Sequence, residues 1–356
     1  MERPHNFSAG PCILPLEVFE KASQSVIDLD NSGLSILEIS HRSTAFVGII
    51  EKARELALEH LNLQGKGYKA LFLQGGASLQ FLMTAYNLLE KKAGYLDTGT
   101  WSSNAIKEAN NFGETEVLAS SKSSNYNYIP KDFSIPEGLD YLHYTSNNTI
   151  YGTQMKTFPK KANTPLVCDM SSDIFSRQLD YSQFDLIYAG AQKNMGPAGA
   201  TLVVVKEDIL GKVSRAIPSM MDYQLMIKRE SMFNTPPVFS VYVSMLNLEW
   251  LSRNGGVPSI EKKNQAKADL IYSEIDRNPL FKGFTALEDR SMMNATFSLK
   301  EKQLGPKFDE LWKASHINGL SGHRSVGGYR ASMYNALTLD SVKVLVDVMK
   351  HFEKTA

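Results

Sequence analysis

The sequence predicts an α/β fold built on a mostly parallel sheet, and two observations lead to this fold class. Short runs of β-forming residues alternate with longer stretches in which apolar residues recur at helical spacing. Each β-forming run also ends in small or polar residues, as strands of an α/β sheet commonly do. Ligands of such sheets bind at the carboxyl ends of the strands, so we expect the chemistry in the residues that follow each run.

The strands and helices can be read in order along the chain. The run KALFLQ at 69–74 reads as a buried strand, and the stretch SLQFLMTAYNLLEKK that follows places Leu82, Ala85 and Leu89 on one helical face. The later runs GYLDTG, GLDYLHYTS, PLVCDMSS, DLIYAGA and TLVVV read as further strands, with helical segments between several of them. These six runs predict one large, mostly parallel sheet.

The helical pattern is interrupted near SRNGGVPS, at 252–259, which predicts a domain boundary. Gly255, Gly256 and Pro258 interrupt one helix, and IEKKNQAKADLIYSEID then reads as a long amphipathic helix. We expect a large domain at 16–254 and a smaller α/β domain formed by 1–15 and 255–356.

The composition excludes several classes of protein. The 356 residues carry 38 Lys and Arg against 38 Asp and Glu, so the charge balance gives no reason to expect nucleic acid or an anionic membrane as partner. Two cysteines, Cys12 and Cys168, are too few for a disulfide scaffold. We find neither a signal-peptide core nor an apolar run near the ~18 residues of a membrane helix, and we predict a cytoplasmic protein.

Four segments at predicted strand ends carry side chains suited to binding or catalysis. The turn Gly75-Gly76-Ala77-Ser78 opens a helix and could cradle a phosphate, or it could be a plain tight turn. Trp101 could stack on a planar ligand or pack in the core, and the polar cluster Thr145–Thr149 could bind a ligand oxygen or form an ordinary turn. Asp169 could serve the site or cap the next segment.

Lys193 ends the run FDLIYAGAQK, where a buried amine would have a depressed pKa and act as a nucleophile, although a lysine at a strand edge can also extend into solvent. A lysine for a Schiff base, a carboxylate for a ring nitrogen, a phosphate cradle and a stacking aromatic together are what pyridoxal 5'-phosphate requires. The strand ends therefore predict that cofactor.

Motifs along nearly the whole chain resemble the phosphoserine aminotransferase family, which belongs to the fold-type I, aspartate aminotransferase-like enzymes. The motifs are NFSAGP, SHRS, GYLDTGTW, YAGAQKNMGPAG, SMFNTPP and GHRSVGGYRASMYNA. The resemblance implies a large domain with a mostly parallel sheet of seven strands and a smaller C-terminal α/β domain. It also implies a homodimer with two shared active sites. It also implies reversible amino transfer between L-glutamate and 3-phosphohydroxypyruvate in serine biosynthesis, and leaves open the related step of vitamin B6 synthesis.

The resemblance also implies the role of each site residue. Lys193 looks like the Schiff-base lysine, Asp169 like the partner of the ring nitrogen, Trp101 like the stacking aromatic and Thr149 like the donor to the phenolic oxygen. The phosphate-binding positions match Ala77, Ser78 and Gln192, and Asn234 and Thr235 match residues contributed by the neighbouring subunit. Some family members carry arginine where Ser78 stands. The segment NTPP also reads as a helix start capped by Thr235.

Two His-Arg pairs point to an anionic substrate. His41-Arg42 and His323-Arg324 could clamp carboxylate or phosphate, and Arg330 follows the second pair across two glycines. Any single pair of this kind is usually an ordinary surface feature. The resemblance implies that Arg330 holds the α-carboxylate and that the two pairs hold the distal group, some of them from the partner subunit.

Two alternatives remain at this stage. The first is another fold-type I enzyme. A cysteine desulfurase needs a reactive cysteine on a mobile loop, whereas Cys12 lies in the N-terminal segment and Cys168 in a predicted strand. Other aminotransferases, such as an alanine–glyoxylate type, do not need the doubled His-Arg clamp. The other is a non-catalytic nucleotide-binding module, but the turn reads G-G-A-S-L-Q and lacks the G-x-G-x-x-G spacing.

Overall fold

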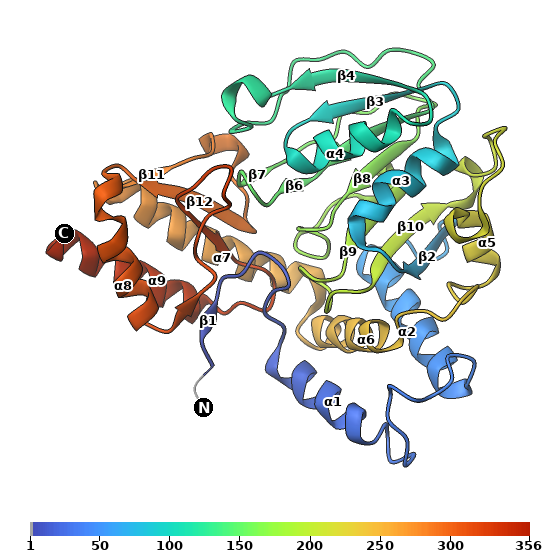
Figure 1. Ribbon diagram of the computed structural model, residues 1–356, viewed down its shortest axis with the longest axis horizontal. Helices are drawn as coiled ribbons and strands as arrows, with labels where there is room; N and C mark the ends of the chain where they lie inside the picture. The colour runs from blue at the N-terminus through green and yellow to red at the C-terminus, as the bar shows by residue number, and fades with distance from the viewer. Residues whose placement is uncertain (1–2) are drawn as a thin grey trace.

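A seven-stranded sheet forms the centre of the computed structural model, which describes residues 3–356 (Figure 1). The spatial order of the strands is β2 (Tyr68–Leu73), β10 (Thr201–Lys206), β9 (Leu186–Gly190), β8 (Leu166–Asp169), β5 (Tyr141–Thr145), β3 (Lys92–Asp97) and β4 (Glu114–Ser120). Only β10 runs antiparallel to its neighbours within this sheet. The predicted mostly parallel sheet of seven strands is thereby confirmed.

Helices cover both faces of the sheet, because its strands are apolar on both sides. Along β9, Ile187 packs with one core and the next residue, Tyr188, packs with the other. The first face is covered by α1 (Leu16–Ile27), α2 (Thr44–His60) and α6 (Val238–Arg253). The second is covered by α3 (Gly76–Leu88), α4 (Thr100–Ala109) and α5 (Tyr223–Lys228). In Figure 1, α6 and α1 lie below the sheet.

The C-terminal part of the chain has a core of its own. It contains α7 (Gly256–Arg277), a three-stranded antiparallel sheet of β11 (Phe281–Gly283), β12 (Asn294–Leu299) and β14 (Tyr329–Ser332), and the helices α8 (Gly305–Ala314) and α9 (Leu339–Thr355). The N-terminal β1 (His5–Asn6) pairs with β13 (Ile317–Asn318), and Phe7 belongs to this core. Two separate cores favour the predicted domain boundaries, which stay a prediction.

Short elements complete the described chain. A hairpin of β6 (Asn147–Asn148) and β7 (Thr153–Gln154) follows β5. Single 3-10 turns lie at Lys122–Ser124, Tyr181–Gln183, Glu207–Ile209, Ser219–Met221, Leu287–Asp289 and Lys302–Leu304. None of the helices described for residues 3–356 has the length and apolar character needed to cross a membrane.

The predicted helix start at NTPP is wrong by two or three residues. Helix α6 begins at Val238, with Pro237 at its N-cap, so Thr235 does not cap it. The physical reason is that a residue before proline is pushed into extended conformations, and both Thr235 and Pro236 precede a proline. The predicted break at Gly255 and Gly256 is confirmed, because α6 ends at Arg253 and α7 begins at Gly256.

Candidate active site

The register of the sheet brings the predicted strand-end residues to one edge. Thr201, the first residue of β10, pairs with Leu73 on one side and with Gly190 on the other, so β2 and β9 end at the same level. Asp169, the last residue of β8, pairs with Thr145 and with Tyr188. The segments that follow β2, β9, β8, β5 and β3 therefore leave the sheet at a common edge.

Lys193 lies three residues beyond the end of β9, and its side chain is only partly buried. Its Nζ is 5.7 Å from the centre of the Trp101 ring. Burial lowers the pKa of Lys193, the Asp169 carboxylate raises it in part, and Arg330 lowers it again. The amine is thus available in its neutral form at a lower pH than in an ordinary lysine, as a nucleophile or general base requires.

Asp169 is the buried carboxylate of the site, with 5% of its surface exposed. Burial raises its pKa, whereas Lys193 and the hydrogen bonds from Ser171 lower it. Its Oδ1 accepts a hydrogen bond from the Ser171 backbone N at 2.9 Å. The sequence analysis left open whether Asp169 caps the next segment or serves the site; it does make that local hydrogen bond, and it also lies close enough to Lys193 to change its pKa.

Trp101, Thr149 and Arg330 form a connected group beside Lys193. Trp101 lies in the first turn of α4, and its Nε1 donates to Thr149 Oγ1 at 3.1 Å. Arg330 on β14 donates from a terminal nitrogen to the Thr149 carbonyl at 3.2 Å. The Nε of Arg330 is buried and has no hydrogen-bond partner within residues 3–356, and the bond to Thr149 is the only side-chain hydrogen bond of Arg330 there, so several N–H donors remain for a ligand.

The turn after β2 has the form expected of a phosphate cradle. Gly75 adopts a left-handed conformation, with φ +91°, and no side chain of the described residues caps the N-terminus of α3. A side chain at Gly75 would collide with Leu79, since a Cβ there would lie 2.4 Å from Leu79 Cδ2. The free N–H groups of this turn, with the exposed Ser78 hydroxyl and the partly buried Ala77 beside it, fit an anion. Gln192, the last phosphate position predicted, lies next to Lys193.

His323 and Arg324 lie in the loop before β14, close to Arg330. His323 Nδ1 lies 2.7 Å from Ser325 Oγ, and burial together with Arg330 and Arg324 lowers the pKa of the histidine. His323 and Arg330 line one small cavity together with Ile150. The structure therefore brings two of the five predicted substrate-binding residues to one space, and Arg324 follows His323 in the same loop.

His41 and Arg42 do not join this group within one chain. They lie in the connection between α1 and α2, which Figure 1 shows well apart from β12 and the C-terminal helices. Arg42 is exposed, and the Nε2 of His41 is buried without a partner in the described part of the chain.

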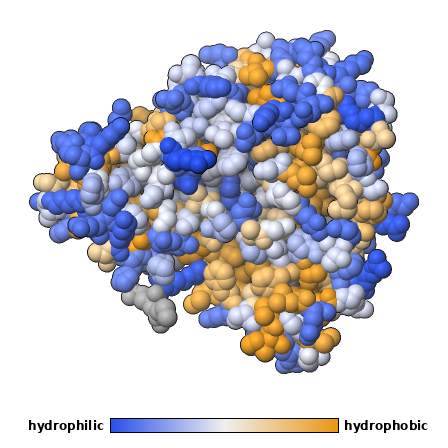
Figure 2. Space-filling model, viewed as in Figure 1, coloured by the Kyte–Doolittle hydropathy of each residue, from blue (hydrophilic) through white to orange (hydrophobic). Residues whose placement is uncertain are grey.

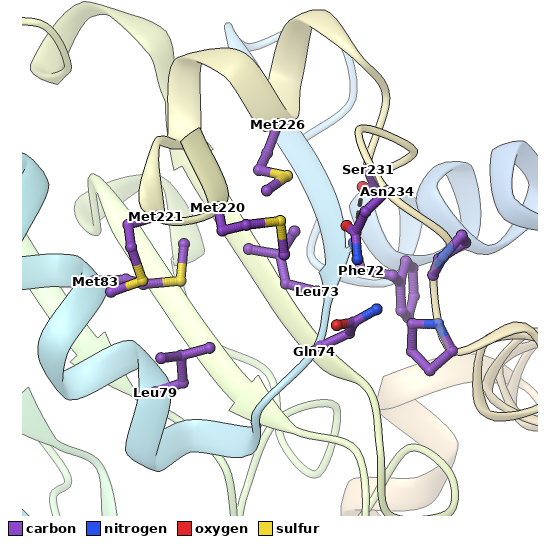
Figure 3. Close-up of a pocket in the computed structure, with 12 residues that line it drawn as sticks. Phe72, Leu73, Gln74, Leu79, Met83, Met220, Met221, Met226, Ser231 and Asn234 are labelled. Atoms are coloured by element: carbon purple, nitrogen blue, oxygen red, sulfur yellow. Dashed lines mark hydrogen bonds between the residues drawn. The ribbon is translucent and has the colours of Figure 1, made fainter. Parts of the chain in front are cut away.

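Asn234 and Thr235 also lie away from Lys193, beside the outer strand β2. Thr235 accepts a hydrogen bond from Gln74 Nε2 at 2.6 Å. Asn234 lines an apolar pocket whose other walls include several methionines, among them Met83 and Met220 (Figure 3). The contribution of Asn234 and Thr235 to a neighbouring subunit stays a prediction from the family resemblance.

The N-terminal residues around Gly10 and Cys12 contact the lysine segment and were missed as site residues. The Cys12 backbone N donates to the Gln192 carbonyl at 3.1 Å. The only signal in the sequence was the motif NFSAGP, which carries no ionisable side chain. Spacing alone could not place it, because about 180 residues separate it from Lys193.

The donors of this site fit pyridoxal 5'-phosphate, and comparison with known proteins agrees. The family model described as aminotransferase class-V matches residues 5–345. The phosphoserine aminotransferase of Flavobacterium psychrophilum is 67% identical to the chain, with 99% of each chain covered. This chain belongs to the phosphoserine aminotransferase family. The predicted family, enzyme class and cofactor are confirmed by this membership.

Solved structures of the phosphoserine aminotransferase family have the same fold. The enzyme from Bacillus circulans subsp. alkalophilus is 44% identical, with a TM-score of 0.96 and coverage of 100% of this chain and 99% of that chain. The pyridoxal-phosphate-bound enzyme from Trichomonas vaginalis is 34% identical, with a TM-score of 0.92 and coverage of 98% and 100%. The predicted fold-type I architecture is confirmed, and the nucleotide-binding alternative is set aside.

Proposed function

We propose that this protein catalyses the reversible transfer of an amino group between L-glutamate and 3-phosphohydroxypyruvate, giving O-phospho-L-serine and 2-oxoglutarate. The observation that supports it most is the placement of a partly buried amine, Lys193, within 5.7 Å of the Trp101 ring and close to the buried carboxylate of Asp169. Family membership and the doubled His-Arg pairs favour a phosphorylated substrate with two anionic ends.

The cofactor would be held at its ring and at its phosphate. The residues proposed to contact it are Trp101, Thr149, Asp169 and Lys193 at the ring, and Ala77, Ser78 and Gln192, with Asn234 and Thr235 of the partner subunit, at the phosphate. When bound, pyridoxal phosphate supplies an electron sink that stabilises negative charge at the substrate Cα. The free backbone N–H groups at the N-terminus of α3, where the helix dipole is positive, would bind the phosphate group.

Lys193 moves the proton in the proposed mechanism. With its pKa lowered by burial, the neutral amine would remove the proton from the substrate Cα as a general base and then, as a general acid, deliver it to the aldehyde-derived carbon of the bound cofactor, so that the amino group stays with the cofactor. The Asp169 carboxylate would keep a proton on the ring nitrogen by pairing with it, because the buried anion would then gain a charged partner.

Arg330 orients both substrates in the same way. Its guanidinium is anchored on the Thr149 carbonyl and retains a free buried Nε, so it can bind the α-carboxylate that all the substrates share. His323 and Arg324 lie beside it and would bind the distal group, which is a carboxylate in glutamate and a phosphate in phosphoserine. One cationic clamp can accept both because arginine binds either anion in a bidentate manner.

A homodimer would complete the distal clamp. His41 and Arg42 lie too far from the C-terminal unit in one chain, so we propose that they serve the active site of the partner. An exposed apolar surface adjoins them on α1 and the connection to α2, formed by Leu16, Phe19, Val26, Ile27, Leu34 and Leu37. Figure 2 shows apolar side chains gathered at this end of the molecule. Such a surface suits burial against a second copy. We also propose a cytoplasmic location, which the two free cysteines support.

Competition between amino donors tests the proposed substrate. With 2-oxoglutarate as acceptor, O-phospho-L-serine is expected to give a kcat/KM at least about 10³-fold above that of L-alanine, because only the phosphorylated donor engages the distal clamp. Comparable values for the two donors would overturn the proposal and point to another aminotransferase of the same fold.

A further inference from the structure

The N-terminal segment at 5–12, here called the N-terminal strap, runs from the C-terminal unit to the catalytic lysine. Figure 1 shows this blue segment passing from β1, beside the C-terminal helices, toward the sheet before it turns down into α1. Its first residues are fixed to the C-terminal unit: Phe7 N donates to the Asn318 carbonyl at 2.8 Å, and Ser332 N donates to the Phe7 carbonyl at 3.3 Å.

The strap then crosses to the lysine segment. The Tyr334 hydroxyl donates to the Ala9 carbonyl at 2.8 Å. Three residues later, the Cys12 backbone N donates to the Gln192 carbonyl, and the Cys12 thiol donates to the Lys193 carbonyl. The carbonyls that precede and follow the Lys193 amide nitrogen are thus both held by one strap residue.

Gly10 lies directly against the aliphatic part of the catalytic side chain. A Cβ at this position would lie 3.3 Å from Lys193 Cγ, and Gly10 has a φ of +139°, which side chains rarely adopt. Contacts this close move one of the two groups by a few tenths of an ångström. Only glycine at position 10 leaves the present path open to the Lys193 side chain.

The other end of the strap reaches the strand that carries the substrate clamp. Ser332, which donates to Phe7, lies on β14 two residues after Arg330. Strand β14 and the backbone of Lys193 are therefore connected through one short hydrogen-bonded segment.

We propose that the N-terminal strap positions the catalytic lysine, with Gly10 and Cys12 as positioning residues that fix the path of Lys193 relative to Arg330. This inference rests on the proposed function. A strap that only closes the protein core would affect stability when changed, whereas a positioning strap also affects the rate of the reaction and the titration of the site.

The test compares Gly10→Ala with a matched control, Gly65→Ala, in the holoenzyme. Gly65 also has a positive φ, +67°, but no heavy atom of the described residues lies within 4 Å of its added Cβ. We expect Gly10→Ala to lower kcat at least about tenfold with the KM for phosphoserine within about threefold of wild type. We also expect the pH midpoint of the visible cofactor absorption to move by about half a unit or more. Gly65→Ala should change neither.

Wild-type kcat and pH midpoint in folded Gly10→Ala, or equal changes in both glycine variants, would overturn the inference. Should Gly10→Ala not fold, Cys12→Ala decides: it is expected to lower kcat and move the midpoint, and Cys12→Ser, which keeps a donor, should restore most of both. A Cys12→Ala protein with wild-type values would then overturn it. Failure of the proposed function is distinguishable, because the wild-type protein itself would then lack phosphoserine turnover.

Discussion

Lys193 and Asp169 are the two residues whose charges depend most on each other. Each is buried enough to shift its pKa toward the neutral form, and each opposes that shift in the other. The carboxylate favours the ammonium form of Lys193, so the pKa of the amine reports directly on its neighbour. The electrostatics of the site can therefore be tested in the protein without cofactor.

Asp169→Asn is expected to lower the pKa of Lys193 further. The isosteric amide removes the negative charge that favours the ammonium, so the neutral, reactive amine forms at lower pH. Labelling of Lys193 in cofactor-free protein by an amine-directed reagent, followed across pH by peptide mass spectrometry, measures this shift. The exposed Lys350 serves as the internal control. A midpoint for Lys193 that stays the same or rises would contradict the proposed pairing.

Arg330→Met is expected to raise the KM values of glutamate and of phosphoserine together, each by about 10²-fold, because both lose the partner of their α-carboxylate. Arg324→Met, the matched control on the distal side, should weaken binding of the two substrates unequally. Steady-state kinetics with both donors separates the two cases. A KM for glutamate unaffected by Arg330→Met would rule out the shared role.

At this scale the sequence was informative wherever a residue type carried chemistry. Lys193, Asp169 and Trp101 were predicted because a lysine, a carboxylate and an aromatic follow strands. Gly10 and Cys12 could not be found, since their roles come from backbone and packing contacts between distant segments. The degree of Lys193 burial also differed, since its side chain is only partly buried.

The elements of the large sheet were readable because each strand is short, apolar and followed by a break. All the strands named from the sequence are present. The antiparallel direction of β10 was not predicted, since periodicity gives no strand direction, and the turn through Gly196 and Gly199 reverses the chain. Strand β4, which is half-exposed at the edge, lacked the continuous apolar run of the central strands.

Helix α7 carries a buried lysine, Lys267. The sequence pattern predicted the amphipathic helix but no role for this lysine. Lys267 is 1% exposed and donates to the carbonyls of Met333, Tyr334 and Leu337 at 2.8–3.0 Å. Burial lowers its pKa to about 7. It therefore fixes the segment that follows β14 to α7 through its donors.

Lys267→Met is expected to destabilise the protein by about 2–4 kcal/mol, because it leaves three buried carbonyls without a donor. Lys262→Met, at another exposed lysine of α7, is the matched control and should change little. Between pH 7 and 10 the unfolded state holds more protons at residue 267 than the folded state does. The difference in free energy of unfolding between wild type and Lys267→Met should therefore grow with rising pH. Urea unfolding at pH 7 and 9 measures both effects. A difference in free energy of unfolding that shrinks with rising pH would contradict the depressed pKa of Lys267.

At the scale of the whole molecule, the two His-Arg pairs lie apart within one chain, which supports the proposed homodimer. One pair lies with Arg330, and the other lies beside the exposed apolar surface of α1. The sequence could predict both pairs but not their separation, which depends on how α1 and α2 pack below the sheet.

A mixture of Lys193→Ala and Arg42→Ala subunits is expected to recover activity that neither variant has alone. After unfolding and refolding together, about half of the dimers are hybrids, and each hybrid has one site with an intact Lys193 and Arg42 of the partner subunit. The expected recovery is therefore about a quarter of the wild-type kcat/KM at low substrate. Recovery no greater than the average of the two separate variants would place Arg42 in the same site as Lys193 of its own chain.

The absorption spectrum of the holoenzyme tests the central claim most directly. Pyridoxal phosphate bound at Lys193 is expected to give a visible band, which one equivalent of O-phospho-L-serine abolishes and 2-oxoglutarate restores, since the two halves of the reaction share one site. Lys193→Ala should bind the cofactor without cycling between the two states. A wild-type band that persists in the presence of phosphoserine, or a Lys193→Ala protein that cycles as fast as wild type, would contradict the proposed function.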